Sequence, residues 1–113
     1  MLPQAHRLSK QKDFDGVWER GRTAQDDYLK IRLVANHQKQ TRFGLIIAVK
    51  TAKQATVRNR LRRQLNSALR LRLKKIKPGQ DVVLTVKSKL VGASYQELEV
   101  GLDRLLNKAK LYD

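Results

Sequence analysis

The chain has 113 residues, with 25 Lys or Arg against 10 Asp or Glu, which gives a formal net charge of +15 at pH 7. Its hydrophobic content of 41% excludes a disordered tail, the lack of cysteine excludes disulfides and thiolate metal sites, and its length suits one domain, residues 1–113. The chain does not begin with an apolar run, and the longest such run, residues 43–49, is too short to span a membrane, so we expect a cytoplasmic protein.

The first half of the chain predicts one short helix and two strands. Phe14 and Trp18 are four residues apart and share one face of a helix predicted over residues 13–20. Apolar residues alternate over residues 28–35, which predicts a strand with one buried face. Residues 42–49 are mostly apolar and rich in β-branched side chains, so we expect a central strand buried on both faces.

The second half predicts a long basic helix, a strand and a last helix. A helical period runs over residues 55–75, and Pro78 with the following glycine stops it. A strand follows over residues 81–87, and Ser94 with Glu97 forms a capping box that begins the last helix. This order is typical of an α+β sheet with helices packed on it, in which the basic helix could join two parallel strands.

The positive charge lies in one stretch of the chain. The 53 residues between Asp27 and Asp81 contain no acid and hold 15 of the 25 basic residues, while the other 60 residues hold 10 basic and 10 acidic groups. A helix that needs only solubility mixes charges, because opposite charges four residues apart stabilise it. We therefore predict a polyanionic partner, the alternative being a solvated charged face.

The helical period sorts the basic helix into two surfaces. The stripe expected to pack consists of Val57, Leu61, Leu65 and Ala68, flanked by Leu69, Leu71 and Arg72. The opposite arc consists of Asn59, Arg62, Arg63, Arg70 and Lys74. Arginine grips phosphate oxygens with two parallel hydrogen bonds, and Asn59 can reach a phosphate, a 2′-hydroxyl or a base edge.

The aromatic pair Phe14 and Trp18 has two interpretations. Aromatic residues on a short amphipathic helix commonly pack into the core. They could instead form a stacking platform for unpaired bases, and the basic residues around them favour a single-strand groove. Tyr28 has the same two interpretations, core packing or base stacking.

Catalytic patterns are weak. Asp13 and Asp15 face different ways on a helix and suit favourable charge at its N-terminus better than a two-metal site. His6 and His37 lie in polar segments and are typical of exposed histidines rather than an acid–base pair. Residues 50–51 lack the glycines of a phosphate-binding loop. We therefore predict no catalytic or metal-binding residue in the chain.

The ordered motifs resemble those of the bacterial ribonuclease P protein component. The signature on the basic helix is Arg58-Asn59-Arg60, followed by Leu61-Arg62-Arg63. The other matches, in the order of the family, are Arg7-Leu8, Asp13-Phe14, Val17-Trp18, Arg42-Phe43-Gly44, Ala48, Ala55, residues 78–83 and residues 94–98. Many members have two lysines where Val49-Lys50 stands, and an Arg and a Glu where Asn66-Ser67 stands, so the face that meets RNA could be shifted.

The resemblance implies a fold and an activity. The fold would be that of domain two of ribosomal protein S5, a mixed four-stranded sheet with three helices and a left-handed βαβ crossover, against the usual hand. The activity would be removal of the 5′ leader from precursor tRNA by an RNA subunit that uses Mg²⁺. The protein would be a non-catalytic subunit of this endoribonuclease, without a cofactor of its own, bound to the catalytic RNA in a 1:1 complex and to precursor tRNA, and not to a membrane.

The resemblance also implies residue roles. The residues expected to contact the catalytic RNA are Lys50, Lys53, Arg58, Asn59, Arg60, Arg62, Arg63 and Arg70. Those expected to line the cleft for the single-stranded leader, between the first helix and the sheet, are Lys12, Phe14 and Trp18. The main alternative is a structural RNA-binding protein of the ribosomal type, and a nuclease that needs no RNA subunit is a weaker one.

Overall fold

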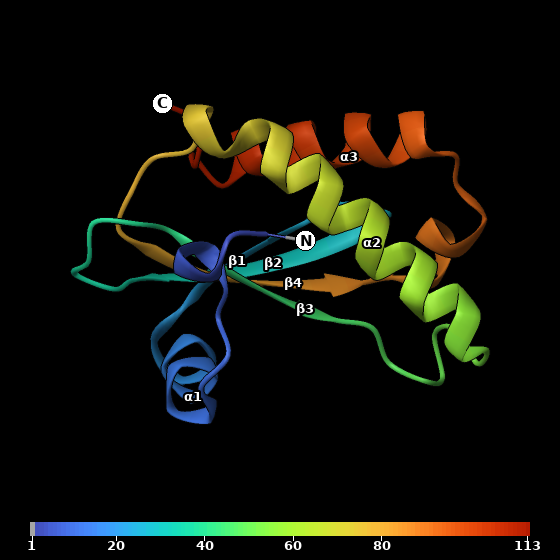
Figure 1. Cartoon of the computed structure of the whole chain (residues 1–113), viewed down its shortest axis with the longest axis horizontal. Coiled ribbons are helices and arrows are strands. Elements are labelled where there is room, and N and C mark those ends of the chain that lie inside the picture. The colour runs from blue at the N-terminus through green and yellow to red at the C-terminus, as the bar shows by residue number, and fades with distance from the viewer. Residues whose placement is uncertain (1) are drawn as a thin grey trace.

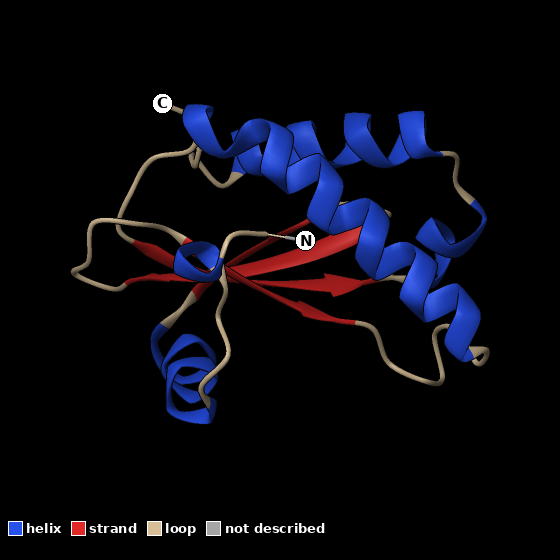
Figure 2. Cartoon of the chain, viewed as in Figure 1, coloured by secondary structure: helices blue, strands red, loops and turns tan. Residues whose placement is uncertain are grey.

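The computed structural model describes residues 2–113, which form one four-stranded sheet with helices on both faces (Figure 1). The long elements are, in chain order, α1 (Gln11–Arg20), β1 (Arg22–Gln25), β2 (Leu29–Ala35), β3 (Arg42–Ile46), α2 (Ala55–Arg72), β4 (Gln80–Val86) and α3 (Tyr95–Lys108). The short 3-10 turns are η1 (Gln4–His6), η2 (Leu73–Lys75) and η3 (Ser88–Gly92). Figure 2 shows the same arrangement by element type and agrees with the predicted α+β fold class.

The sheet is mixed, with the strand order β1-β2-β4-β3. β2 pairs antiparallel with β1 and β4, whereas β3 pairs parallel with β4. The parallel pair is joined through α2, which confirms that the basic helix is the crossover between two parallel strands. The left hand of this crossover remains an expectation from the resemblance.

The prediction of a central strand over residues 42–49 is wrong. β3 ends at Ile46 and lies at an edge of the sheet, whereas β2 and β4 are the strands with a neighbour on each side. The run is apolar because its side chains join two different clusters. Phe43 and Ile47 belong to the core under α2 and α3, while Ile46 packs against the smaller cluster under α1.

Element boundaries differ from the predictions in small ways. α1 begins at Gln11, two residues before the predicted start, and the helical stretch over 55–75 changes from α-helix to 3-10 turn at Leu73. The polar strand β1 was not predicted as a separate element. Leu71, expected beside the packed stripe of α2, is 71% exposed and so lies outside that stripe.

The two faces of the sheet are covered unequally. α2 and α3 lie side by side over one face, and α1 lies on the other (Figure 1). α2 packs through Leu61, Leu65, Ala68 and Leu69, which confirms most of the predicted stripe. α1 packs through a small cluster of Leu8, Val17 and Val83. The smaller helix therefore leaves part of its face of the sheet available to other contacts.

The last helix begins as the sequence predicts. The hydroxyl of Ser94 accepts a hydrogen bond from the backbone N–H of Glu97, and the carboxylate of Glu97 accepts one from the backbone N–H of Ser94. The bond from the backbone N–H of Ser94, with a smaller contribution from the Ser94 side chain, holds the pKa of Glu97 below its ordinary value. None of the helices within residues 2–113 is both long and apolar enough to cross a membrane.

Candidate nucleic-acid interface

The exposed arc of α2 carries polar side chains with no carboxylate beside them. Asn59, Arg62 and Arg63 are all exposed. In the part of the chain that the structure describes, Arg72 alone among the basic residues of α2 forms an ion pair. The nearest partner of Arg62 is the side-chain oxygen of Asn59, at 3.5 Å from Nη1. The protein itself therefore leaves the positive charge of this arc uncompensated.

Arg58 and Arg60 are partly engaged within the protein. Arg58 Nη1 donates to the carbonyl oxygens of Ala52 and Lys53, at 2.9 Å each. Arg60 Nη2 donates to the carbonyl oxygen of Val91 in η3, at 3.1 Å. Carbonyl acceptors leave both guanidinium charges in place. Arg58 thus holds the loop before α2, and Arg60 holds η3 beside it. Both arginines still add to the positive field of α2.

The remaining predicted RNA contacts extend the basic arc in both directions. Lys50 and Lys53 are exposed in the loop between β3 and α2, which Arg58 holds at its far end. Arg70 is exposed on α2, two helical turns beyond Arg63. At 1.5 Å per residue, the span from Arg58 to Arg70 is about 18 Å. That length is sufficient for contacts to several successive phosphates.

Two arginines of the acid-free stretch, Arg42 and Arg72, are paired with acids from elsewhere in the chain. Arg42 forms two hydrogen bonds to the carboxylate of Asp81, at 2.8 and 2.7 Å. Arg72 binds Glu99 and Asp103 of α3. Hydrogen bonds that the arginines donate to these carboxylates raise the pKa of both arginines, and the Arg72 guanidinium lowers the pKa of Asp103.

A groove of about 210 Å³ lies where the N-terminal segment, β3 and α2 meet. Its lining includes Phe14 from α1, Gly44 and Leu45 from β3, and Arg62 with Asn66 from α2. The sequence assigned Phe14 and Arg62 to different sites, and the structure brings them to one groove. Arg7 also lines it and was not predicted as a site residue. In the sequence, only the position of Arg7 beside Leu8 in the Arg-Leu motif could have indicated that Arg7 belongs to a site.

Phe14 is partly buried and serves the core and the groove together. It packs against the cluster of Leu8, Val17 and Val83, as core packing predicts. Its ring also lies over Gly44, where an added Cβ would be 2.6 Å from Phe14 Cζ. The ring therefore lies directly on the β3 backbone and forms part of the groove wall.

Trp18 and Lys12 take different positions on α1. Trp18 is 42% exposed, so it is not a core residue and its ring is available for stacking. Lys12 is two residues from Phe14 and therefore points to another side of the helix. It lines a polar cavity with Arg20 and His37, and the structure does not bring it into the groove with Phe14.

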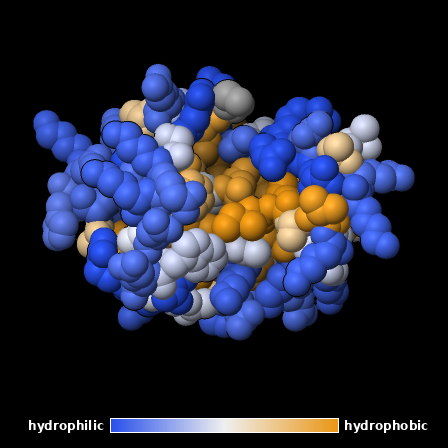
Figure 3. Space-filling model, turned by 90° about the horizontal axis from the view of Figure 1, so that it is seen from below, coloured by the Kyte–Doolittle hydropathy of each residue, from blue (hydrophilic) through white to orange (hydrophobic). Residues whose placement is uncertain are grey.

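The face of the molecule that carries α1 combines hydrophobic and hydrophilic surface. Viewed from that side, Figure 3 shows a hydrophobic area in the centre with hydrophilic residues around it. Half-buried Phe14, Val34 and Ile46 pack on the cluster under α1. Aromatic surface beside positive charge is the combination found in proteins that bind single-stranded nucleic acid, and the groove of Phe14 supplies that charge through Arg7 and Arg62.

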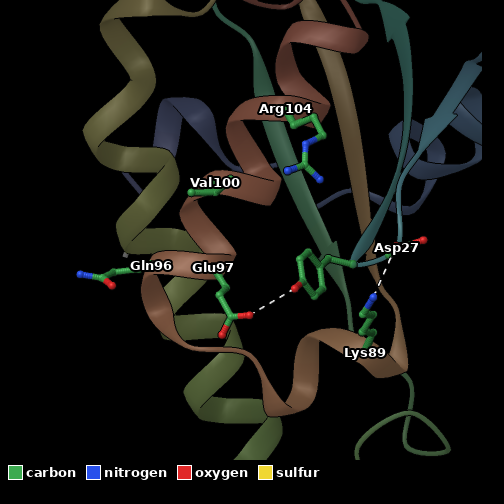
Figure 4. Close-up of a pocket in the computed structure, with 7 residues that line it drawn as sticks. Asp27, Lys89, Gln96, Glu97, Val100 and Arg104 are labelled. Carbon is green, nitrogen blue, oxygen red and sulfur yellow. Dashed lines mark hydrogen bonds and ion pairs between the residues drawn. The ribbon is translucent and has the colours of Figure 1, made fainter.

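Tyr28 lies in a separate pocket, of about 380 Å³, that shares no lining residue with the groove of Phe14 (Figure 4). Its hydroxyl donates to Glu97 at 3.4 Å, and its ring packs where Gly101 lacks a Cβ. Lys89 lies over the ring and pairs with Asp27. Charges of both signs line this pocket, so it offers a polyanion no net attraction.

The described residues include no group of three or more His, Asp or Glu side chains arranged to hold a metal ion. His6 is bonded through Nδ1 to the carbonyl oxygen of Thr41, at 2.8 Å. His37 lines a different cavity, in the loop after β2. The two histidines thus have separate surroundings.

The fold and the charge distribution define a small basic α+β domain of the RNA-binding class. The family model described as Ribonuclease P matches residues 2–110. The chain therefore belongs to the ribonuclease P protein family.

Curated relatives and solved structures agree with this assignment. The ribonuclease P protein component of Rippkaea orientalis is 36% identical over 97% of this chain and 91% of its own length. That of Synechocystis sp. is 34% identical over 99% of this chain and 91% of its own length. The RNase P protein of Thermotoga maritima superposes with a TM-score of 0.83 at 25% identity, covering 90% of this chain and 96% of that one. The Staphylococcus aureus protein superposes with a TM-score of 0.89 at 18% identity, covering 97% and 100%, and supports the fold.

Proposed function

We propose that this protein is the subunit of ribonuclease P that binds the catalytic RNA through α2 and the 5′ leader of precursor tRNA through the groove of Phe14. Removal of the leader is then the chemistry of the RNA subunit and its Mg²⁺, and the protein supplies binding and orientation. The complex contains one protein per RNA and works in the cytoplasm.

The arc of α2 supplies the contacts to the catalytic RNA. Arg62 and Arg63 are exposed and unpaired with carboxylates in the described residues, so each can grip a phosphate with two hydrogen bonds. Asn59 adds a donor and an acceptor for a 2′-hydroxyl or base edge. Lys50, Lys53 and Arg70 contribute point charges at the two ends of the arc.

The groove and α1 supply the contacts to the leader. Phe14 forms part of the groove wall and Trp18 is exposed one helical turn away. Each aromatic ring can stack with one unpaired base, which contributes about 1–3 kcal/mol per base without strong sequence preference. Such tolerance is required of a protein that handles many different leaders.

The observation that carries the proposal is that Arg62 and Phe14 line the same groove. A strand lying on Phe14 passes directly beside the arc of α2. The leader is therefore held next to the catalytic RNA, which lets the protein recognise the substrate and the catalyst at once. A protein that only stabilises RNA structure would not need an aromatic wall at the end of its basic helix.

The test compares precursor tRNAs that have a long leader with those that lack one, in the reconstituted holoenzyme at limiting Mg²⁺. Phe14→Ala is expected to weaken binding of the long-leader substrate by about 1–3 kcal/mol and to leave the leaderless substrate unchanged. Tyr28→Ala removes an aromatic from the separate pocket and serves as the matched control. Equal effects of Phe14→Ala on both substrates would contradict the leader role, and failure of the wild type to stimulate leader removal would contradict the whole proposal.

A further inference from the structure

α1 is attached to the sheet by arginines at both of its ends. At its beginning, Arg42 of β3 lies 3.4 Å from the carboxylate of Asp13. At its end, Arg32 of β2 reaches over the last turn. Arg32 Nε donates to the carbonyl oxygen of Val17 at 3.0 Å, and Nη2 donates to that of Trp18 at 2.6 Å. The two arginines thus hold the helix that carries the proposed leader-binding aromatics.

Arg32 forms hydrogen bonds through all three of its guanidinium nitrogens. Besides the two helix carbonyls, Nη1 donates to the hydroxyl of Thr23 in β1 at 2.8 Å. Carbonyl oxygens at the end of a helix lack partners within the helix and carry partial negative charge, so a guanidinium there is favourable. A lysine has a single nitrogen and cannot reproduce three bonds in this geometry.

The chain around Arg32 is packed closely enough to fix its position. Gly21 ends α1, and its backbone N–H donates to the Val17 carbonyl at 2.8 Å. A Cβ added at Gly21 would lie 3.0 Å from Arg32 Cγ and 3.1 Å from the Leu33 carbonyl oxygen. The turn between α1 and β1 therefore closes directly over the stem of Arg32.

The apolar attachment of α1 is small by comparison. The buried side chains of this contact are Val17 of α1 with Leu8 and Val83, and α2 and α3 lie over the opposite face of the sheet (Figure 1). The last turn, which carries Trp18, gains its polar contacts to the sheet from Arg32. Loss of these contacts would free that turn more than any other part of α1.

We propose that Arg32 is a positioning residue for leader binding. It fixes the last turn of α1 to β2 and so holds the Trp18 ring where an unpaired base can stack on it. The inference rests on the proposed leader role of Phe14 and Trp18. With all three of its guanidinium nitrogens bonded within the protein, Arg32 acts through α1.

The experiment uses the reconstituted holoenzyme with Arg32→Lys, which keeps the charge and loses the fork. The preference for a long leader over no leader is expected to fall about three- to tenfold, as loss of charge-assisted hydrogen bonds predicts, and kcat at saturating substrate is expected to stay at the wild-type value. Because Trp18 is the only tryptophan in the chain, its fluorescence anisotropy in the free protein is expected to fall as well.

The matched control is Arg22→Lys. Arg22 of β1 donates from Nη2 to the carbonyl oxygen of Ala109 at the end of α3, at 2.6 Å, so the same substitution there releases a different helix. It should change neither the leader preference nor the anisotropy of Trp18. Circular dichroism verifies that each variant is folded. Arg32→Gln is a second variant, since glutamine can replace one of the three hydrogen bonds, and it is expected to lower both the leader preference and the Trp18 anisotropy.

The outcomes separate the inference from the function on which it rests. If Phe14→Ala abolishes the leader preference while Arg32→Lys and Arg32→Gln keep it, the positioning role is wrong and the leader role stands. If Phe14→Ala keeps the preference, the leader role itself fails. An equal loss with Arg22→Lys would also overturn the inference, because the effect would then not depend on α1.

Discussion

The ring of Phe14 lies on the backbone of β3 at Gly44, so closely that a Cβ at residue 44 would be 2.6 Å from Phe14 Cζ. This contact joins α1 to the edge strand and forms one wall of the groove that Arg62 lines from α2. A glycine at residue 44 is therefore needed for close approach of an aromatic ring, and not for an unusual backbone angle.

The first prediction concerns this contact. Gly44→Ala should displace the Phe14 ring and lower the free energy of unfolding by about 1–3 kcal/mol, as measured by urea denaturation. The preference for long-leader substrate should fall with it. Gly92→Ala is the control, because a Cβ at Gly92 meets nothing within 4 Å. Stability and leader preference equal to those of the wild type in Gly44→Ala would refute the close contact.

The second prediction concerns the salt dependence of RNA binding. Neutralising 6–10 phosphates makes affinity fall by about 10³–10⁵ between 50 and 200 mM salt. Arg62→Ala and Arg63→Ala should each reduce the slope of log K against log salt by about 1, since each removes one phosphate contact. Arg104→Ala removes an exposed charge from α3, outside the proposed interface. Its slope should match the wild type, and equal slopes for all three variants would exclude the arc as the contact surface.

The third prediction concerns stability against pH. The Arg72 guanidinium holds the pKa of Asp103 below its ordinary value of 3.8, and the hydroxyl of Tyr112 also donates to Asp103. A depressed pKa in the folded state contributes stability above the ordinary pKa that is lost as pH falls through the folded value. Burial, and after it the hydrogen bond to Asp103, raises the pKa of Tyr112. The tyrosine therefore stays neutral over the whole acidic range of this experiment.

Asp103→Asn should therefore lower the free energy of unfolding near pH 7 by roughly 1 kcal/mol, a figure reduced because Asp103 is half exposed. The difference from the wild type should begin to shrink as pH falls below about 4 and vanish only once pH is below the lowered pKa of Asp103. Thermal unfolding across this pH range measures both effects. A pH-independent difference would mean that the carboxylate charge is not what Arg72 recognises.

The charge pattern predicted the exposed basic arc of α2, because the helical period and the sign of the charges together separate a buried leucine stripe from an exposed arginine face. It could not predict that Arg42 and Arg72 are neutralised, since their partners lie far along the chain. Asp81 approaches Arg42 only through the pairing of β3 with β4, and Asp103 approaches Arg72 only when α3 packs beside α2. Local sequence carries no signal for either contact.

The groove of Phe14 could not be predicted either, because it also depends on contacts between segments that are far apart in the sequence. It forms because the backbone N–H of Leu8 donates to the carbonyl oxygen of Phe43 at 2.9 Å, which places the N-terminal segment along the edge of β3. An apolar run over residues 42–49 indicates burial and not strand order, so it suggested a central strand where an edge strand stands. The strand β1 was missed because its four residues are largely exposed and lack the alternation of a half-buried strand.

The most direct test of the account is leader removal by the catalytic RNA at limiting Mg²⁺, with a long-leader precursor tRNA and limiting protein. The wild-type chain should stimulate cleavage, the double variant Arg62→Ala with Arg63→Ala should require more protein for the same rate, and Phe14→Ala should lose the advantage of the long leader. Wild-type rates from all of these proteins would contradict the proposal that one groove brings the leader and the catalytic RNA together.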